Sequence, residues 1–423
     1  MRRINLRLLP FLFLLYIVAF LDRSNIGYAG KPISDELGFS KEVFGFGAGI
    51  FFIGYVLLEI PGTILVELWS ARKWIARIMI SWGLIAGLTG LVHTARQFYW
   101  ARFLLGVAEA GFLPGVIVYL THWYRSADRA KAIALFMSAI PLSQVIGAPL
   151  SAELMKLHWL GWSGWRWMLI LEGAPAILLG MVTIFYLTDR PQHAKWLPQA
   201  ERDWIVGELE AEKRVKSAAG SPGMWRALGE RNVLLLTLAY FCGATLQYGL
   251  ILWLPQMIGD LSKGWSIQKI TIISAIPYLA AWPAMLAIGW HSDRTRERRV
   301  HTAVCMIVSG AALLVAQFTG KSMVLGLILF SNAAMGINGR LAAFWAMPSS
   351  FLSGTAAATA IGLINCIGNT GGFAGPYIVG FLHKHTGYVG GVAFLIGSAF
   401  VGAAAVLMVR KTDDRKSEGV TLG

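Results

Sequence analysis

The chain has 423 residues, of which 56% are hydrophobic and 14% charged, and its formal net charge is +14. A soluble domain carries about 25% charged residues, so this composition excludes an ordinary soluble protein and indicates a membrane protein. Cys242, Cys305 and Cys366 all lie in apolar runs, which argues against a disulfide framework or a metal site.

Apolar runs long enough to cross a bilayer recur along the whole chain. A transmembrane helix needs about 20 such residues, and on this basis the sequence predicts an all-α membrane protein with twelve spans. The basic start of the first run resembles a signal peptide, but no small-x-small cleavage site follows it. The predicted spans are 8–30, 43–66, 75–95, 98–120, 132–155, 167–187, 232–255, 269–290, 302–319, 323–345, 355–381 and 389–409.

The distribution of basic residues predicts the orientation of these spans. With the N-terminus in the cytoplasm, about 24 of the 37 Lys and Arg residues fall in inside loops and about nine in outside loops. The positive charge is therefore expected to set the topology rather than to bind nucleic acid. Both termini are predicted to be cytoplasmic, in the inner (plasma) membrane.

A polar segment divides the spans into two sets of six. It contains an apolar helical pattern at Trp204, Ile205 and Leu209, followed by a Gly/Ser/Pro-rich tail, which predicts an amphipathic helix and a flexible linker. Two equal sets are typical of duplicated transporters, whose binding site lies between the repeats near the midplane. The predicted boundaries are 1–187, a linker over 188–231, a second half over 232–409 and a tail over 410–423.

Ionisable residues inside the predicted spans are the main functional signal. Asp22 and Arg23 are adjacent in the first span, and Arg102 and Glu109 stand seven residues apart in the fourth, which places them on one helix face. Charges at membrane depth are costly and mark ion or substrate pathways. Glu109 lies about 16 Å from the outer end of its span, close to the middle of the membrane.

Several blocks together resemble the anion:cation symporter branch of the major facilitator superfamily. They include LDRSNIGYA near residue 21, GYVLLEIPG near 54, RFLLGVAEAGFLPG near 102, GWRWMLILEGAPAILLG near 164 and AAATAIGLINCIGNTGGFAGPYIVG near 356. The resemblance implies a major facilitator fold of two six-helix halves. It also implies transport of organic anions such as tartrate, phthalate, 4-hydroxyphenylacetate or sugar acids, generally with protons.

Residues at these motif positions are assigned coupling roles in the galactonate and glutamate carriers that the chain resembles. We therefore expect Glu109 and Asp22 to carry protons and Arg23 and Arg102 to hold the substrate anion. A guanidinium offers a planar fork that can hold a substrate carboxylate or Glu109, but not fully both. The alternatives are a permanent structural ion pair and, for Arg102, extension of the side chain to the outer surface.

A second group of residues is expected to line the cavity, although each also has a purely structural explanation as a packed or interhelical polar side chain. Arg340 departs from the pattern of the resembling proteins, which have a neutral residue there; it either extends to the cytoplasm or supplies a third positive charge that favours a dicarboxylate. Glu59 and Glu172 lie near span ends and are taken as structural. The expected lining residues are Tyr55, Gln144, Gln247, Tyr248, Trp345, Asn365, Asn369 and Arg340.

The loop GWHSDRTRERR, from Gly289, matches the major facilitator loop pattern of glycine, Asp-Arg and a basic pair. We expect Asp293 and Arg294 to act as a gate latch, with plain topogenic charge as the alternative. The loop from Gly62 is a degraded copy of the same pattern.

The sequence thus favours a proton-coupled symporter for a small organic anion that works as a monomer, without cofactor or metal. A uniporter or an anion exchanger of the same fold is the alternative. An enzyme is not supported, because the sequence contains no HExxH, GxSxG or P-loop motif.

Overall fold

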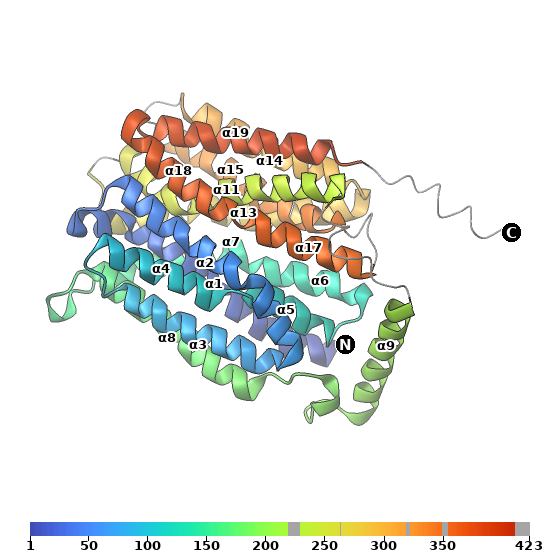
Figure 1. The fold of residues 1–423 in the computed structure, drawn as a ribbon. Helices are drawn as coiled ribbons and strands as arrows, with labels where there is room; N and C mark the ends of the chain where they lie inside the picture. Colours follow the sequence, from blue (N-terminus) through green and yellow to red (C-terminus); the bar gives the residue numbers. More distant parts are fainter. Residues whose placement is uncertain (219–228, 263, 319–321, 349–353, 411–423) are drawn as a thin grey trace.

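The computed structural model describes residues 1–218, 229–262, 264–318, 322–348 and 354–410. Within these ranges the elements are helical and form two bundles that lie side by side (Figure 1). The first bundle comprises α1 Arg2–Leu37, α2 Lys41–Leu68, α3 Ala71–Thr89, α4 Ala95–Glu109, α5 Phe112–Thr121, α6 Ser126–Met137, α7 Ala139–Leu154 and α8 Gly164–Tyr186. The second comprises α11 Arg231–Leu261, α12 Ile267–Ile273, α13 Ile276–Thr295, α14 Arg298–Ala316, α15 Met323–Trp345, α17 Gly354–Gly368, α18 Gly371–Thr386 and α19 Tyr388–Leu407.

Ten helical stretches among the described residues are long and apolar enough to cross a membrane. They account for ten of the twelve predicted spans. The remaining two correspond to α3, whose first turn contains Arg72 and Lys73, and to the pair α17 and α18. The predicted all-α membrane fold is confirmed, and the observed helices extend beyond several predicted ends: α1, for example, continues to Leu37 rather than residue 30.

Local signals explain where helices begin and end. The Ser40 hydroxyl accepts a hydrogen bond from the Val43 N–H at 3.2 Å and so caps α2. Thr94 and Gln97 form a reciprocal capping box at the start of α4. Gly38 ends α1 in the left-handed conformation, with φ of 68°, which glycine adopts without strain.

The helix α9, Gln199–Ala218, lies across the bundle at the end where the N-terminus is found (Figure 1). Its Ile205 side chain is fully buried, as its apolar pattern predicts. Two ion pairs join it to the first half: Arg125, directly before α6, pairs with Glu208 at 3.2 Å, and Arg129 on α6 pairs with Glu212 at 3.1 Å. The helix is therefore attached to the first half.

The two halves meet along a surface that we call the seam, formed by α1, α2 and α7 of the first half and by α11, α12, α13, α17 and α18 of the second. At the end of the bundle opposite the N-terminus, backbones touch across it. A Cβ atom on Gly45 would lie 2.5 Å from the Pro376 carbonyl oxygen, and one on Gly49 would lie 2.9 Å from that of Phe373. The seam is thus tightly closed at that end.

Candidate functional site: a buried ion pair facing the seam

The predicted charged residues of the first half meet in its interior. Arg23, on α1, donates from Nε and Nη2 to the same oxygen of Glu109, on α4, at 2.6 and 2.5 Å. The Glu109 side chain is fully buried and that of Arg23 is 9% exposed. Since a guanidinium remains charged in proteins, this geometry describes an ion pair between an arginine and a carboxylate.

Glu109 is the last residue of α4, directly before a break in the predicted span 98–120. Gly111 has a φ of 81° and α5 starts at Phe112, so the span predicted over 98–120 is present but consists of two consecutive helices. The signals were in the sequence: Gly111 and Pro114 are ordinary helix-ending residues. Because the C-terminal end of a helix carries partial negative charge, a carboxylate at this position depends on a neighbouring cation.

Gly106 allows α4 to pack closely against α2, and this close packing positions Glu109. A Cβ atom at this position would lie 1.9 Å from the Phe51 carbonyl oxygen on α2. Only glycine allows the two backbones to pack at this distance.

Arg102 and Asp22 extend the same charged group. Arg102 is 3% exposed, so its side chain turns into the protein rather than out to the membrane surface. Its guanidinium lies 5.1 Å from the centre of the Phe51 ring and within electrostatic range of Asp22 and Glu109. Asp22 is 2% exposed and accepts a hydrogen bond from Asn25 at 3.1 Å.

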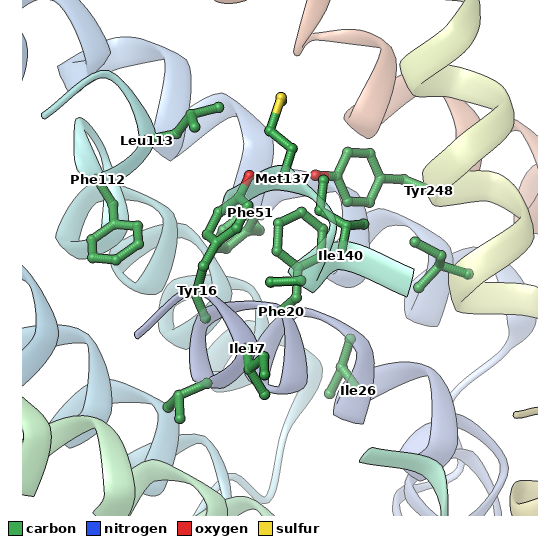
Figure 2. Close-up of a cluster of buried hydrophobic side chains, with 14 of the residues drawn as sticks. Tyr16, Ile17, Phe20, Ile26, Phe51, Phe112, Leu113, Met137, Ile140 and Tyr248 are labelled. Atoms are coloured by element: carbon green, nitrogen blue, oxygen red, sulfur yellow. The ribbon is translucent and has the colours of Figure 1, made fainter. Parts of the chain in front are cut away.

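Aromatic rings surround the Arg23 guanidinium. The centres of the Phe20 and Tyr55 rings both lie 5.0 Å from it and that of Phe51 lies at 5.6 Å. Tyr55, which was expected to line the site, is therefore part of this aromatic wall. Figure 2 shows the apolar surroundings, in which the Tyr248 hydroxyl points toward side chains of the first half.

Tyr248 connects the ion pair to the second half. Its hydroxyl lies 3.1 Å from Nη1 of Arg23 and comes from α11, across the seam. The charged group therefore contacts both halves and is placed where their relative movement can change its partners. By contrast, Gln144 accepts a hydrogen bond from Tyr28 at 3.2 Å, within the first half.

Arg340 is the basic side chain of the second half that lies deep in the protein. It is 1% exposed, and Nη2 contacts the Gln247 side-chain oxygen at 3.5 Å. Its guanidinium fits against Gly243 and lies 6.0 Å from the centre of the Tyr240 ring. Trp345 also packs edge-on against Tyr240, with ring centres 4.8 Å apart.

Glu59 was taken as a structural residue near a span end, but the structure places it at the seam. It is 3% exposed and accepts a hydrogen bond from Asn365 of α17. Asn369, expected with Asn365 on one helix face, lies in the break between α17 and α18 and also interacts with Glu59. The sequence did contain a signal for this position: Glu59 follows Tyr55 by four residues, which places both side chains on the same face of α2.

Glu172 lies inside the first half, where it accepts a hydrogen bond from Ser151 at 2.6 Å.

The expected gate residues, Asp293 and Arg294, lie in the last turn of α13 in the second half. Asp293 pairs with Arg298, and the Arg294 guanidinium lies 5.5 Å from the centre of the Trp290 ring. These contacts are within the second half. A latch across the seam therefore stays a prediction for another conformation.

Two bundles of long apolar helices with a buried charged group at their seam are typical of a multi-pass membrane transporter. The family model of the major facilitator superfamily matches residues 12–376 and, in a second match, 264–422. The chain belongs to the major facilitator superfamily.

Two relatives support this membership, and a solved structure shares the fold. The chain is 45% identical to a protein of Agrobacterium vitis named "Putative tartrate transporter", over 97% of this chain and 95% of the relative. It is 39% identical to the "Putative metabolite transport protein NicT" of Pseudomonas putida, over 91% and 88%. The fold is similar to a crystal structure of a bacterial homologue of the human lysosomal transporter Spinster in an inward-facing and occupied conformation, with a TM-score of 0.74, 18% identity and coverage of 95% and 96%.

Proposed function

We propose that this protein is a proton-coupled symporter that imports a small organic carboxylate across the inner membrane by alternating access. The observation that carries this proposal is the buried Arg23–Glu109 ion pair, which the second half contacts through Tyr248. The kind of anion is supported by the relative named for tartrate.

The coupling follows from competition for one guanidinium. Glu109 occupies Nε and Nη2 of Arg23, the two groups that a bidentate substrate carboxylate would use. When a proton neutralises Glu109, the ion pair loses its charge and Arg23 is released to bind the anion. When the proton leaves, Glu109 reclaims Arg23 and the substrate is displaced.

Arg102 and Asp22 serve the same exchange. Arg102 lies within electrostatic range of both Asp22 and Glu109, so it stabilises whichever carboxylate is ionised. Asp22 is the second candidate proton carrier because it is buried and adjacent to Arg23 in the chain. Both residues are fixed on helices that border the ion pair.

The topology proposed from the basic residues puts both termini and α9 in the cytoplasm, with 188–231 as the linker between two halves bounded at 187 and 232. The end of the seam that is closed by Gly45 and Gly49 then faces outward.

Purified protein in liposomes tests the proposal. We expect an acid-outside pH gradient to drive accumulation of labelled tartrate and a protonophore to abolish it. An anion exchanger would instead be stimulated by tartrate inside the liposomes and would be indifferent to the protonophore. That result would replace the symporter by the alternative.

A further inference from the structure

Arg340 has fewer partners than a buried guanidinium requires. Its side chain is 1% exposed, and within the described part of the chain its guanidinium has one hydrogen bond, from Nη2 to the Gln247 side-chain oxygen at 3.5 Å. Among the described residues, its Nε and Nη1 atoms have no hydrogen-bond partner. A desolvated charge is strongly unfavourable unless an opposite charge or several acceptors compensate it.

The second half supplies no carboxylate for this purpose. Between residues 232 and 409 the sequence contains Asp260, Asp293 and Glu297 as its acidic residues, and they lie at the ends of α11, α13 and α14. The Tyr240 ring, 6.0 Å from the guanidinium, gives only a weak cation–π contribution at this distance. The compensating charge must therefore come from outside the second half.

Arg340 and Arg23 both contact α11. The Tyr248 hydroxyl accepts from Nη1 of Arg23 at 3.1 Å, and its neighbour in the chain, Gln247, accepts from Nη2 of Arg340 at 3.5 Å. Gly243, one turn before Gln247, lets the guanidinium rest against the α11 backbone, since a Cβ atom there would lie 2.4 Å from Cζ of Arg340. Two arginines from opposite halves thus contact neighbouring residues of α11.

We propose that Arg340 binds the second carboxylate of the substrate, so that the transported anion is a small dicarboxylate held between Arg23 of one half and Arg340 of the other. This inference rests on the proposed function and narrows its substrate class. A ligand that bridges both halves also links binding to their relative movement. A monocarboxylate would fill the Arg23 side and leave Arg340 without a counter-ion.

The test compares tartrate with threonate, in which one carboxylate of tartrate is replaced by a hydroxymethyl group. Binding of both anions is measured by calorimetry on the purified full chain, and uptake is measured in liposomes. Arg340→Gln should weaken tartrate roughly 30-fold or more, the usual scale for removing one member of a buried charge pair. Threonate binding should change less than about threefold, within the scatter of a neutral contact.

Two further variants separate a binding role from a folding role. Gly243→Ala keeps the charge but displaces the guanidinium, and should also lower the preference for tartrate over threonate. Arg96→Gln removes an exposed arginine and should leave both anions unaffected.

Equal losses for both anions in Arg340→Gln, or no loss for either, would overturn the dicarboxylate inference while leaving the symporter proposal intact. Preference of the unmodified protein for threonate over tartrate would overturn it as well. Failure of the unmodified protein to bind any carboxylate would overturn both proposals.

Discussion

The two halves of the molecule share an architecture but differ in the charges that they bury. The interior of the first half contains four buried carboxylates, Asp22, Glu59, Glu109 and Glu172. The second half keeps its three acidic residues at helix ends and buries the cation Arg340. Among the described residues, the buried carboxylates that could accept a proton therefore lie in the first half.

This difference suggests a division of labour. In the proposed mechanism, protons bind in the first half, where Glu109 competes with the substrate for Arg23. The same proposal divides recognition of substrate charge between Arg23 and Arg340. It also assigns the coupling between the halves to the polar contacts of Tyr248 and Asn365 across the seam.

The largest effect is expected at the shared guanidinium. Arg23→Ala should lower uptake of labelled tartrate roughly 100-fold or more, because it removes the counter-charge of both substrate and Glu109. Arg23→Lys should restore little, since an ammonium lacks the planar fork. Arg96→Gln serves as the control, and full activity of the lysine variant would reduce the role of Arg23 to simple positive charge.

A smaller effect is expected at the second contact across the seam. Asn365→Asp places a carboxylate against Glu59 and should slow uptake about tenfold, because like charges in a low-dielectric environment repel. Glu59→Gln in the same chain should recover most of the rate. The double-variant cycle is scored by uptake at matched expression levels, and simple additivity of the two changes would show that the contact is not used in transport.

The closed end of the seam offers a steric test. Gly45→Ala should slow uptake severalfold, because the added methyl group meets the Pro376 carbonyl and opposes closure of that end. Gly397→Ala, on α19, is the matched control, since no heavy atom lies within 4 Å of the added Cβ position. Similar rates for both variants would indicate that tight closure is not required.

The smallest effect is expected at α9. Arg125→Gln removes the ion pair with Glu208, whose side chains are 34% and 44% exposed. Exposed pairs contribute about 0–1 kcal/mol, so uptake should stay within about twofold of the unmodified protein. A complete loss of uptake at normal expression would give α9 a role in the transport cycle that its surface position does not suggest.

The sequence predicted the fold and much of the first-half charge arrangement because both depend on local patterns. Apolar runs identify spans, and the seven-residue spacing of Arg102 and Glu109 fixes their common face. The helix break after Glu109 was not predicted, although Gly111 and Pro114 indicate it in the sequence. The contact between Glu59 and Asn365, 306 residues apart, was not predictable in this way, since it depends on how the two halves pack.

The sequence did not determine the orientation of the Arg340 side chain either. An arginine in the inner third of a span can extend to the surface or turn into the protein, and periodicity does not distinguish the two. The close approach of Gly243 on α11 decides the question in the structure. Such a choice depends on a neighbouring helix and not on the residues around Arg340.

The most direct test of the account replaces Glu109 by glutamine and measures two activities in the same liposomes. Glu109→Gln imitates the protonated carboxylate, so tartrate counterflow should persist while accumulation driven by the pH gradient should disappear. Glu153→Gln, which neutralises an exposed carboxylate of the first half whose side chain is 62% exposed, is the matched control and should retain both activities. Accumulation of tartrate against its gradient by the Glu109→Gln variant would contradict the assignment of proton coupling to the Arg23–Glu109 pair.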